Sequence, residues 1–228
     1  MIKTFTGIVE KKEYLTPSVL FLSLKIPEDF TFIAGQFVNI KMIHEGQSKM
    51  RSYSILNPPT QRGVLELCVK IVEGGFASVV FAQTKIGDVF EMKGPFGHFF
   101  LHSTLSDEHW FICAGTGVVP FYSMLKEHLA ASSGMKFRLI FGTKTQPDLL
   151  FHREFLSWVE KYPHFTYVPT LSRENWEGKL GRVQEHLGED LSHKTFYICG
   201  LKELVLETKE KLLLRGVSSM QIHFERYN

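Results

Sequence analysis

The segment Trp110-Phe-Ile-Cys-Ala-Gly-Thr-Gly-Val-Val-Pro120 joins a short apolar run to a Gly-x-Gly turn and then to a proline. Glycine lets backbone amides approach phosphate oxygens closely, and a helix N-terminus adds N–H donors and a favourable dipole. Proline suits the first helical turn because its missing N–H would be unpaired there. The segment therefore predicts a strand–turn–helix unit that binds a nucleotide diphosphate, although one such turn is equally compatible with a merely tight loop.

Downstream of this turn, buried apolar runs alternate with amphipathic segments, the pattern of a parallel sheet with crossover helices. We expect strands at 110–113, 137–141, 165–169, 196–199 and 221–225. We expect helices between them at 120–131, 149–162, 183–187 and 202–215. The sequence thus predicts a Rossmann-like α/β domain over residues 103–228, with 101–108 as a linker.

Upstream of the turn, the apolar residues alternate in short runs that glycine and proline separate. These runs predict strands at 5–9, 19–26, 37–42, 51–56, 64–71 and 89–93, with a short helix at 76–84. Six such strands indicate a small antiparallel barrel of the Greek-key type. We assign this first domain to residues 1–102.

Composition narrows the classes of function. The chain has 228 residues, 44% of them hydrophobic, and a net charge of +2, so it can bury packed cores but has no general attraction for nucleic acid. Its three cysteines lack the spacing of a zinc site, an iron–sulfur cluster or a thioredoxin motif, and no metal site is predicted from its histidines. No signal-like N-terminus and no run of about 18 apolar residues is present. We expect a cytoplasmic protein without a membrane span.

The segment Arg51-Ser-Tyr-Ser54 combines an arginine, an aromatic ring and hydroxyls, a set that suits a flavin. In a regular strand Arg51 and Tyr53 share one face, and Ser52 and Ser54 share the other. The alternative is an ordinary exposed edge strand. Two later segments, Gly75-Phe-Ala-Ser78 and Gly94-Pro-Phe-Gly97, offer backbone amides to an anion.

Taken in order, these motifs make the chain resemble the ferredoxin–NADP reductase family over nearly its whole length. The resemblance rests on Arg51–Ser54, Gly75–Ser78, Gly94–Gly97, Gly115–Pro120 and Cys199-Gly200. Each motif is short, and their order and spacing carry the resemblance. It implies an FAD-binding barrel followed by a domain that binds NADPH or NADH.

The resemblance also implies roles for single residues. Arg51 would bind the flavin diphosphate, Tyr53 would pack against the isoalloxazine, and Ser54 would place its hydroxyl near N5. The remaining implied FAD contacts are Ser52, Gly75 and Ser78, whereas Gly94-Pro95 would be a turn that shapes the end of the barrel. The implied contacts to the nicotinamide nucleotide are Gly115, Thr116, Gly117, Pro120, Cys199 and Gly200.

The C-terminal residues Glu225-Arg-Tyr227 resemble the family's ending. Tyr227 would cover the flavin and swing aside for nicotinamide, and Glu225 would relay a proton through Ser54. The implied catalytic set is therefore Ser54, Cys199 and Glu225. Asn228 follows Tyr227 and departs from the family pattern, and the alternative is a frayed terminus.

Ser172-Arg173 is similar to the family's segment for the 2′-phosphate of NADPH, with Lys144 as an assisting residue. Because Ser-Arg also occurs in relatives that use NADH, and Lys179 and Arg182 are equally compatible with solvated surface charges, the preference for NADPH is slight.

The predicted activity is that of an FAD-dependent NAD(P)H oxidoreductase. It would transfer a hydride from NAD(P)H to FAD and pass electrons to a separate carrier such as ferredoxin or flavodoxin, or to an oxygenase component. Two alternatives stay open. One is a flavin reductase that releases reduced flavin, and the other is a non-catalytic electron-transfer or nucleotide-binding subunit.

Overall fold

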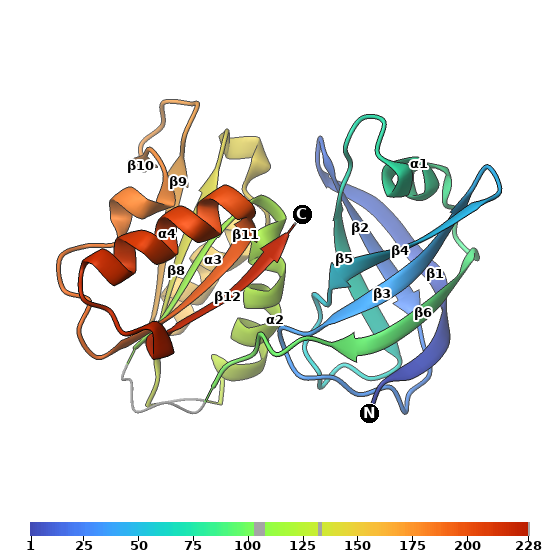
Figure 1. The fold of residues 1–228 in the computed structure, drawn as a ribbon, viewed down its shortest axis with the longest axis horizontal. Coiled ribbons are helices and arrows are strands. Elements are labelled where there is room, and N and C mark those ends of the chain that lie inside the picture. The colour runs from blue at the N-terminus through green and yellow to red at the C-terminus, as the bar shows by residue number, and fades with distance from the viewer. Residues whose placement is uncertain (103–107, 132–133, 228) are drawn as a thin grey trace. The chain divides into compact units, whose positions relative to one another are not determined.

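A computed structural model describes residues 1–102, 108–131 and 134–227 (Figure 1). The chain divides into two compact units. The first contains Met1–Leu101 and Val119–Glu127, and the second contains His102–Val118 and the chain from His128 onward. The expected linker falls largely on residues 103–107, outside the described part, so the domain boundary at 102/103 stays a prediction.

The first unit is built on an antiparallel sheet whose described strands follow the order β4-β3-β6-β1-β2-β5. The strands are β1 (Lys3–Thr16), β2 (Val19–Lys25), β3 (Phe37–His44), β4 (Gln47–Ser54), β5 (Val64–Lys70) and β6 (Val89–Phe96), with helix α1 (Phe76–Gln83) between the last two. The amide of Leu56, just after β4, donates to the Glu66 carbonyl of β5 at 2.9 Å. The two end strands are thereby joined, and the sheet curls as the predicted barrel fold requires.

Alternating side chains of this sheet form the core of the first unit. Leu20, Leu22 and Leu24 of β2 are fully buried, and so are Val38 and Ile40 of β3. The pattern of period two that predicted the strands is therefore the pattern of burial.

Two local predictions in the barrel need correction. Strand β4 spans Gln47–Ser54 rather than 51–56, because Glu45 and Gly46 have φ of 49° and 72° and form a two-residue turn that starts β4 at Gln47. Gly94-Pro95 lies inside β6 and is not a turn. A Cβ on Gly94 would come within 2.9 Å of Val38 Cγ1, so glycine lets β6 pass close to β3.

The second unit is built on a parallel sheet of order β10-β9-β8-β7-β11-β12. Its described strands are β7 (Glu108–Ala114), β8 (Lys136–Thr143), β9 (Phe165–Leu171), β10 (Lys179–Leu180), β11 (Lys194–Leu201) and β12 (Ile222–Tyr227). All neighbouring pairs are parallel, which confirms the predicted fold class. The two-residue β10 was not predicted.

Helical segments follow most of these strands. The α-helices of the described chain after α1 are α2 (Val119–His128), α3 (His152–Lys161) and α4 (Lys202–Leu214). Short 3₁₀ helices occupy Gly115–Val118, Gln146–Asp148, Val183–His186 and Ser219–Gln221. The helix expected at 183–187 is thus a single 3₁₀ segment. Helix α4 covers one face of the parallel sheet (Figure 1). Its Val205 and Leu212 belong to the same buried cluster as Trp110 and Phe196. No described helix is long and apolar enough to cross a bilayer.

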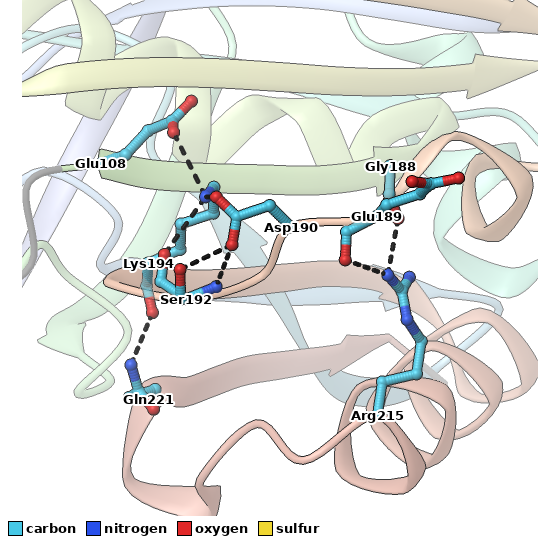
Figure 2. A network of polar contacts seen from close by, with 8 residues as sticks. All are labelled: Glu108, Gly188, Glu189, Asp190, Ser192, Lys194, Arg215 and Gln221. Atoms are coloured by element: carbon cyan, nitrogen blue, oxygen red, sulfur yellow. Dashed lines mark hydrogen bonds and ion pairs between the residues drawn. The ribbon is translucent and has the colours of Figure 1, made fainter.

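A polar network fixes the amino-terminal end of β11 (Figure 2). The buried Lys194 ammonium lies 3.0 Å from Asp190 Oδ2 and 3.9 Å from Glu108 Oε2. Gln221 donates to the Lys194 carbonyl at 2.9 Å, and Arg215 donates to the Gly188 and Glu189 carbonyls. This network lies at the start of β11, whereas Cys199 lies near its end, so it has a structural role.

Candidate active site

The register of β4 decides which way its side chains point. Its pairing with β3 runs without a shift from His44 opposite Gln47 to Phe37 opposite Ser54. Arg51 and Tyr53 therefore lie opposite the buried Ile40 and Val38 and share their face, whereas Ser52 and Ser54 share the other face.

The four residues of this motif differ in their surroundings. Arg51 is exposed and donates to the Met50 carbonyl at 2.9 Å. Ser52 donates its hydroxyl to Asn39 Oδ1 at 2.7 Å across the strand pair. The Tyr53 ring meets Phe81 of α1 edge-on at 5.3 Å, and burial raises the pKa of Tyr53 to about 12 although the Arg51 charge opposes this. Ser54 is buried at the end of β4.

The start of α1 has backbone donors that no side chain caps. Gly75 is the N-cap and has no side chain with which to cap the helix, and no acidic residue lies in the first turn. A Cβ on Gly75 would come within 2.9 Å of Ser78 Oγ and 3.0 Å of the Val72 carbonyl oxygen. Ser78 Oγ accepts a hydrogen bond from the Val72 amide at 2.9 Å, so Ser78 holds the turn that leads into α1.

In the second unit, the strand order reverses between β7 and β11. At such a switch point the carboxyl ends of the two strands border the ligand crevice of an open α/β sheet. The turn Gly115–Val118 follows β7, and Cys199-Gly200 lies at the end of β11. The sheet therefore brings the two predicted nucleotide-binding segments together.

The two glycines of the turn have different structural roles. Gly115 has φ of 55°, and a Cβ built on it would meet nothing within 4 Å. A Cβ on Gly117 would clash with the Cys199 carbonyl group, with the carbonyl carbon 2.8 Å away. Gly117 is thus required for the contact between the turn and β11, and Gly115 leaves open space for a ligand. Thr116 lies between them, and Pro120 is buried in the first turn of α2.

Cys199 lies beside Cys113 in the paired strands, and both thiols are fully buried. Burial raises the pKa of Cys199 well above its usual value, and the Glu225 carboxylate acts in the same direction. A hydrogen bond from Tyr227 opposes these effects. Cys199 therefore presents a neutral thiol rather than a nucleophilic thiolate.

Strand β12 places the C-terminal residues beside Cys199. Glu225 is its register partner, and Tyr227 pairs with Leu201. Cys199, Glu225 and Tyr227 thus belong to the second unit, whereas Ser54 belongs to the first. Asn228 lies outside the described residues.

The loops after β8 and β9 are joined by backbone hydrogen bonds. The Ser172 amide donates to the Thr143 carbonyl and the Arg173 amide to the Lys144 carbonyl, both at 3.0 Å. Glu174 accepts from the Gln146 amide at 2.7 Å. In the described structure neither Arg173 nor Lys144 pairs with a carboxylate, whereas Arg182 forms an ion pair with Glu207 at 3.1 Å.

The strand that the sequence predicted around Arg51 did not include Lys49. Lys49 lies two positions before Arg51 on the same face of β4, and its ammonium lies 4.4 Å from the centroid of the Phe76 ring. The predicted strand began at Arg51 and so excluded Lys49. The Glu45-Gly46 turn was the available signal, because it marks the start of β4. In the described part of the chain, no cluster of three His, Cys, Asp or Glu residues has the arrangement of a metal site.

Comparisons with known proteins cover both units. Residues 6–101 match the oxidoreductase FAD-binding domain model, and residues 111–210 match the oxidoreductase NAD-binding domain model. A ferredoxin–NADP reductase from Sorangium cellulosum is 31% identical over 94% of this chain and 93% of its own length.

Two further relatives are longer than this chain. The reductase component of a phenol 2-monooxygenase from Pseudomonas is 28% identical over 99% of this chain but only 66% of its own length. The crystal structure of a cytochrome P450 reductase from Amycolatopsis superposes with a TM-score of 0.90 and 26% identity, over 99% of this chain and 70% of that one. Because the FAD-binding and NAD-binding domains are both present and the Sorangium relative matches almost end to end, the chain belongs to the ferredoxin–NADP reductase family of FAD-dependent NAD(P)H oxidoreductases.

Proposed function

We propose that this chain oxidises NADPH and delivers electrons to a separate one-electron carrier. The observation that carries the proposal is the switch point of the parallel sheet, where the open Gly115 and the neutral thiol of Cys199 lie at the carboxyl ends of β7 and β11. A nicotinamide nucleotide needs backbone amides for its diphosphate and an uncharged wall for its ring. This arrangement supplies both.

The first unit has the features that FAD requires. Arg51 has no carboxylate partner in the described structure, and its planar fork suits a phosphate. The first turn of α1 carries no side-chain cap and no acidic residue. When bound, FAD supplies the chemistry that amino-acid side chains lack, because it accepts two electrons together and releases them one at a time.

The protein's own residues then hold and protect the reacting groups. Tyr53, which packs against Phe81 and whose raised pKa keeps it neutral even in mild alkali, serves as a rigid aromatic wall. Ser54 offers a hydroxyl at the end of β4, and Glu225 offers a carboxylate for proton relay. Cys199 contributes a polar contact that stays uncharged.

The loops after β8 and β9 carry two cations without acidic partners among the described residues, and these cations favour NADPH over NADH. Arg173 and Lys144 are joined through their backbones and are without acidic partners among the described residues. Glu174, which would repel a 2′-phosphate, is held by the Gln146 amide. Arg182 is already paired with Glu207 and is the weaker candidate.

The proposed acceptor is a protein such as ferredoxin or flavodoxin, or an oxygenase component. Two relatives, a phenol 2-monooxygenase reductase component and a cytochrome P450 reductase, support this class of partner. The sequence has three cysteines, one fewer than the four that ligate an iron–sulfur cluster, and all three are buried in strands.

The proposal is tested with purified protein in an anaerobic stopped-flow instrument, with NADPH and NADH at equal concentrations. We expect one FAD per chain and faster bleaching of its absorbance by NADPH. Ser54→Ala should slow bleaching at least about tenfold without loss of FAD, because it removes a positioned hydroxyl. A colourless protein that reduces and releases added flavin would identify a flavin reductase instead. Failure to reduce ferricyanide with FAD present would contradict the enzyme assignment.

The nucleotide preference has its own variant in the same experiment. Arg173→Ala should lower kcat/KM for NADPH by roughly 10- to 100-fold, the effect of one lost charge-assisted contact, and leave NADH almost unchanged. Arg182→Gln is the matched control, since it removes a cation that Glu207 already neutralises. Equal losses with both nucleotides would contradict the assignment of Arg173 to the 2′-phosphate.

A further inference from the structure

Three side chains of β4 form a row on one face of the strand. Lys49, Arg51 and Tyr53 lie opposite Met42, Ile40 and Val38 of β3, which are fully buried. The row therefore points toward the interior side of the sheet. Lys49 and Arg51 are nevertheless exposed, and they lie on a strand at one end of the sheet order.

Helix α1 contacts both ends of the row. The Tyr53 ring meets Phe81 near the end of α1 at 5.3 Å. The Lys49 ammonium lies 4.4 Å from the ring centroid of Phe76, the first residue of α1. Arg51 lies between Lys49 and Tyr53 in the row, and Lys49 is the cation that lies beside the first residue of α1.

This arrangement concentrates positive charge that the described chain does not neutralise. Neither Lys49 nor Arg51 pairs with a carboxylate there, and the side chains of residues two apart in a strand start only about 7 Å from each other. The nearby His44 meets Phe76 edge-on at 6.0 Å, and its own acidic neighbour is Glu45, at 3.7 Å. Two like charges in one row, one of them beside the positive end of a helix dipole, favour an anion that carries two charges.

We propose that Lys49 is a second ligand for the diphosphate of FAD and selects FAD over FMN. This rests on the proposed function, in which Ser54 marks the isoalloxazine end and Arg51 binds the diphosphate. Lys49 lies beyond Arg51 as seen from Ser54, about 16 Å along the strand from it. The single phosphate of FMN reaches Arg51 alone, whereas the AMP half of FAD extends to Lys49 and the Phe76 ring.

The test is a flavin titration of the apoprotein, followed by quenching of flavin fluorescence. Lys49→Gln should raise the Kd for FAD about tenfold, the effect of one lost charge-assisted contact, and change the Kd for FMN less than about twofold. Lys49→Arg should restore most of the FAD affinity. Lys25→Gln is the matched control, because Lys25 is an exposed lysine on β2 without an ion pair in the described structure.

Separate outcomes distinguish this inference from the proposed function. If Lys49→Gln leaves the Kd for FAD unchanged, or weakens FAD and FMN equally, the role of Lys49 is wrong while the reductase proposal stands. If the unmodified protein binds no flavin at all, the proposed function itself fails. An unchanged melting temperature of the apoprotein shows that each variant is folded.

Discussion

At the scale of single residues, the nucleotide turn shows that identical residues in one motif meet different constraints. Gly115 has a positive φ and faces open space, so the constraint that the structure shows for it comes from the backbone. Gly117 is constrained by the protein itself, because the Cys199 carbonyl occupies the place of its Cβ. The Gly-x-Gly spacing alone does not separate these roles.

The difference between the two glycines predicts unequal effects on stability. Gly117→Ala forces backbone against backbone and should cost about 2–3 kcal/mol, a melting temperature lower by roughly 5–10 °C. Gly115→Ala meets only the strain of a left-handed residue, about 1 kcal/mol. Thermal unfolding by circular dichroism compares the two. An equal loss for both would show that Gly117 does not need its close contact with β11.

At the scale of elements, the start of β4 shows how a turn sets the chemistry of a strand. The Glu45-Gly46 turn extends β4 back to Gln47, and this extension adds Lys49 to the face that carries Arg51 and Tyr53. A strand that began at Arg51 would carry only one cation on this face.

Two titratable groups of the second unit, His109 and Asp190, should lower the free energy of unfolding in two steps as the pH falls. Burial lowers the pKa of His109 on β7 to about 4, and the His128 and His223 charges act in the same direction. The unfolded chain therefore takes up this proton first as the pH falls, and stability is lost between about pH 6.5 and pH 4. The pKa of Asp190 is lowered by hydrogen bonds from Ser192 and then by Lys194, so its contribution is lost only below about pH 4.

Unfolding by urea at several pH values separates the two steps. Between pH 7 and pH 5, the free energy of unfolding should fall by about 1–2 kcal/mol less in His109→Gln than in the unmodified protein. Asp190→Asn is the comparison variant. Its curve should keep the first step and lose part of the second, because a hydrogen bond from Lys3 also lowers the pKa of Asp29. His152 and His223, whose pKa values burial also lowers, should retain part of this first step in His109→Gln. A first step of unchanged size in His109→Gln would contradict the assignment.

At the scale of the whole molecule, the chain passes between its two units more than once. Helix α2 follows β7 of the second unit, yet Val119–Glu127 belong to the first. Ser123 of α2 donates its buried hydroxyl to the Asn57 carbonyl at 2.8 Å, and Phe121 packs against Phe99 at 5.6 Å. The barrel unit is therefore completed by residues that follow it in sequence.

This exchange predicts that residues 1–102 alone are less stable than the same residues in the full chain. Removal of α2 exposes Phe99 and leaves the Asn57 carbonyl without its partner. The loss of a buried aromatic contact lowers the free energy of unfolding by roughly 3–5 kcal/mol, and the unpaired carbonyl lowers it further. Urea unfolding of the fragment and the full chain, each with FAD, measures the difference. Equal midpoints for the two proteins would mean that α2 does not contribute to the barrel unit.

The sequence by itself determined the class of each unit and the identity of the glycine turn. Hydrophobic periodicity and turn residues are local properties, so the barrel strands, the parallel strands and the helix after the turn follow from short windows of sequence. The tertiary structure alone decided that β7 and β11 are neighbours, that Gly117 rests on Cys199 and that α2 belongs with the barrel. It also decided that Arg182 forms an ion pair with Glu207, whereas Arg173 and Lys49 form none with the carboxylates of the described residues. These facts depend on contacts between residues far apart in the chain, which no local pattern encodes.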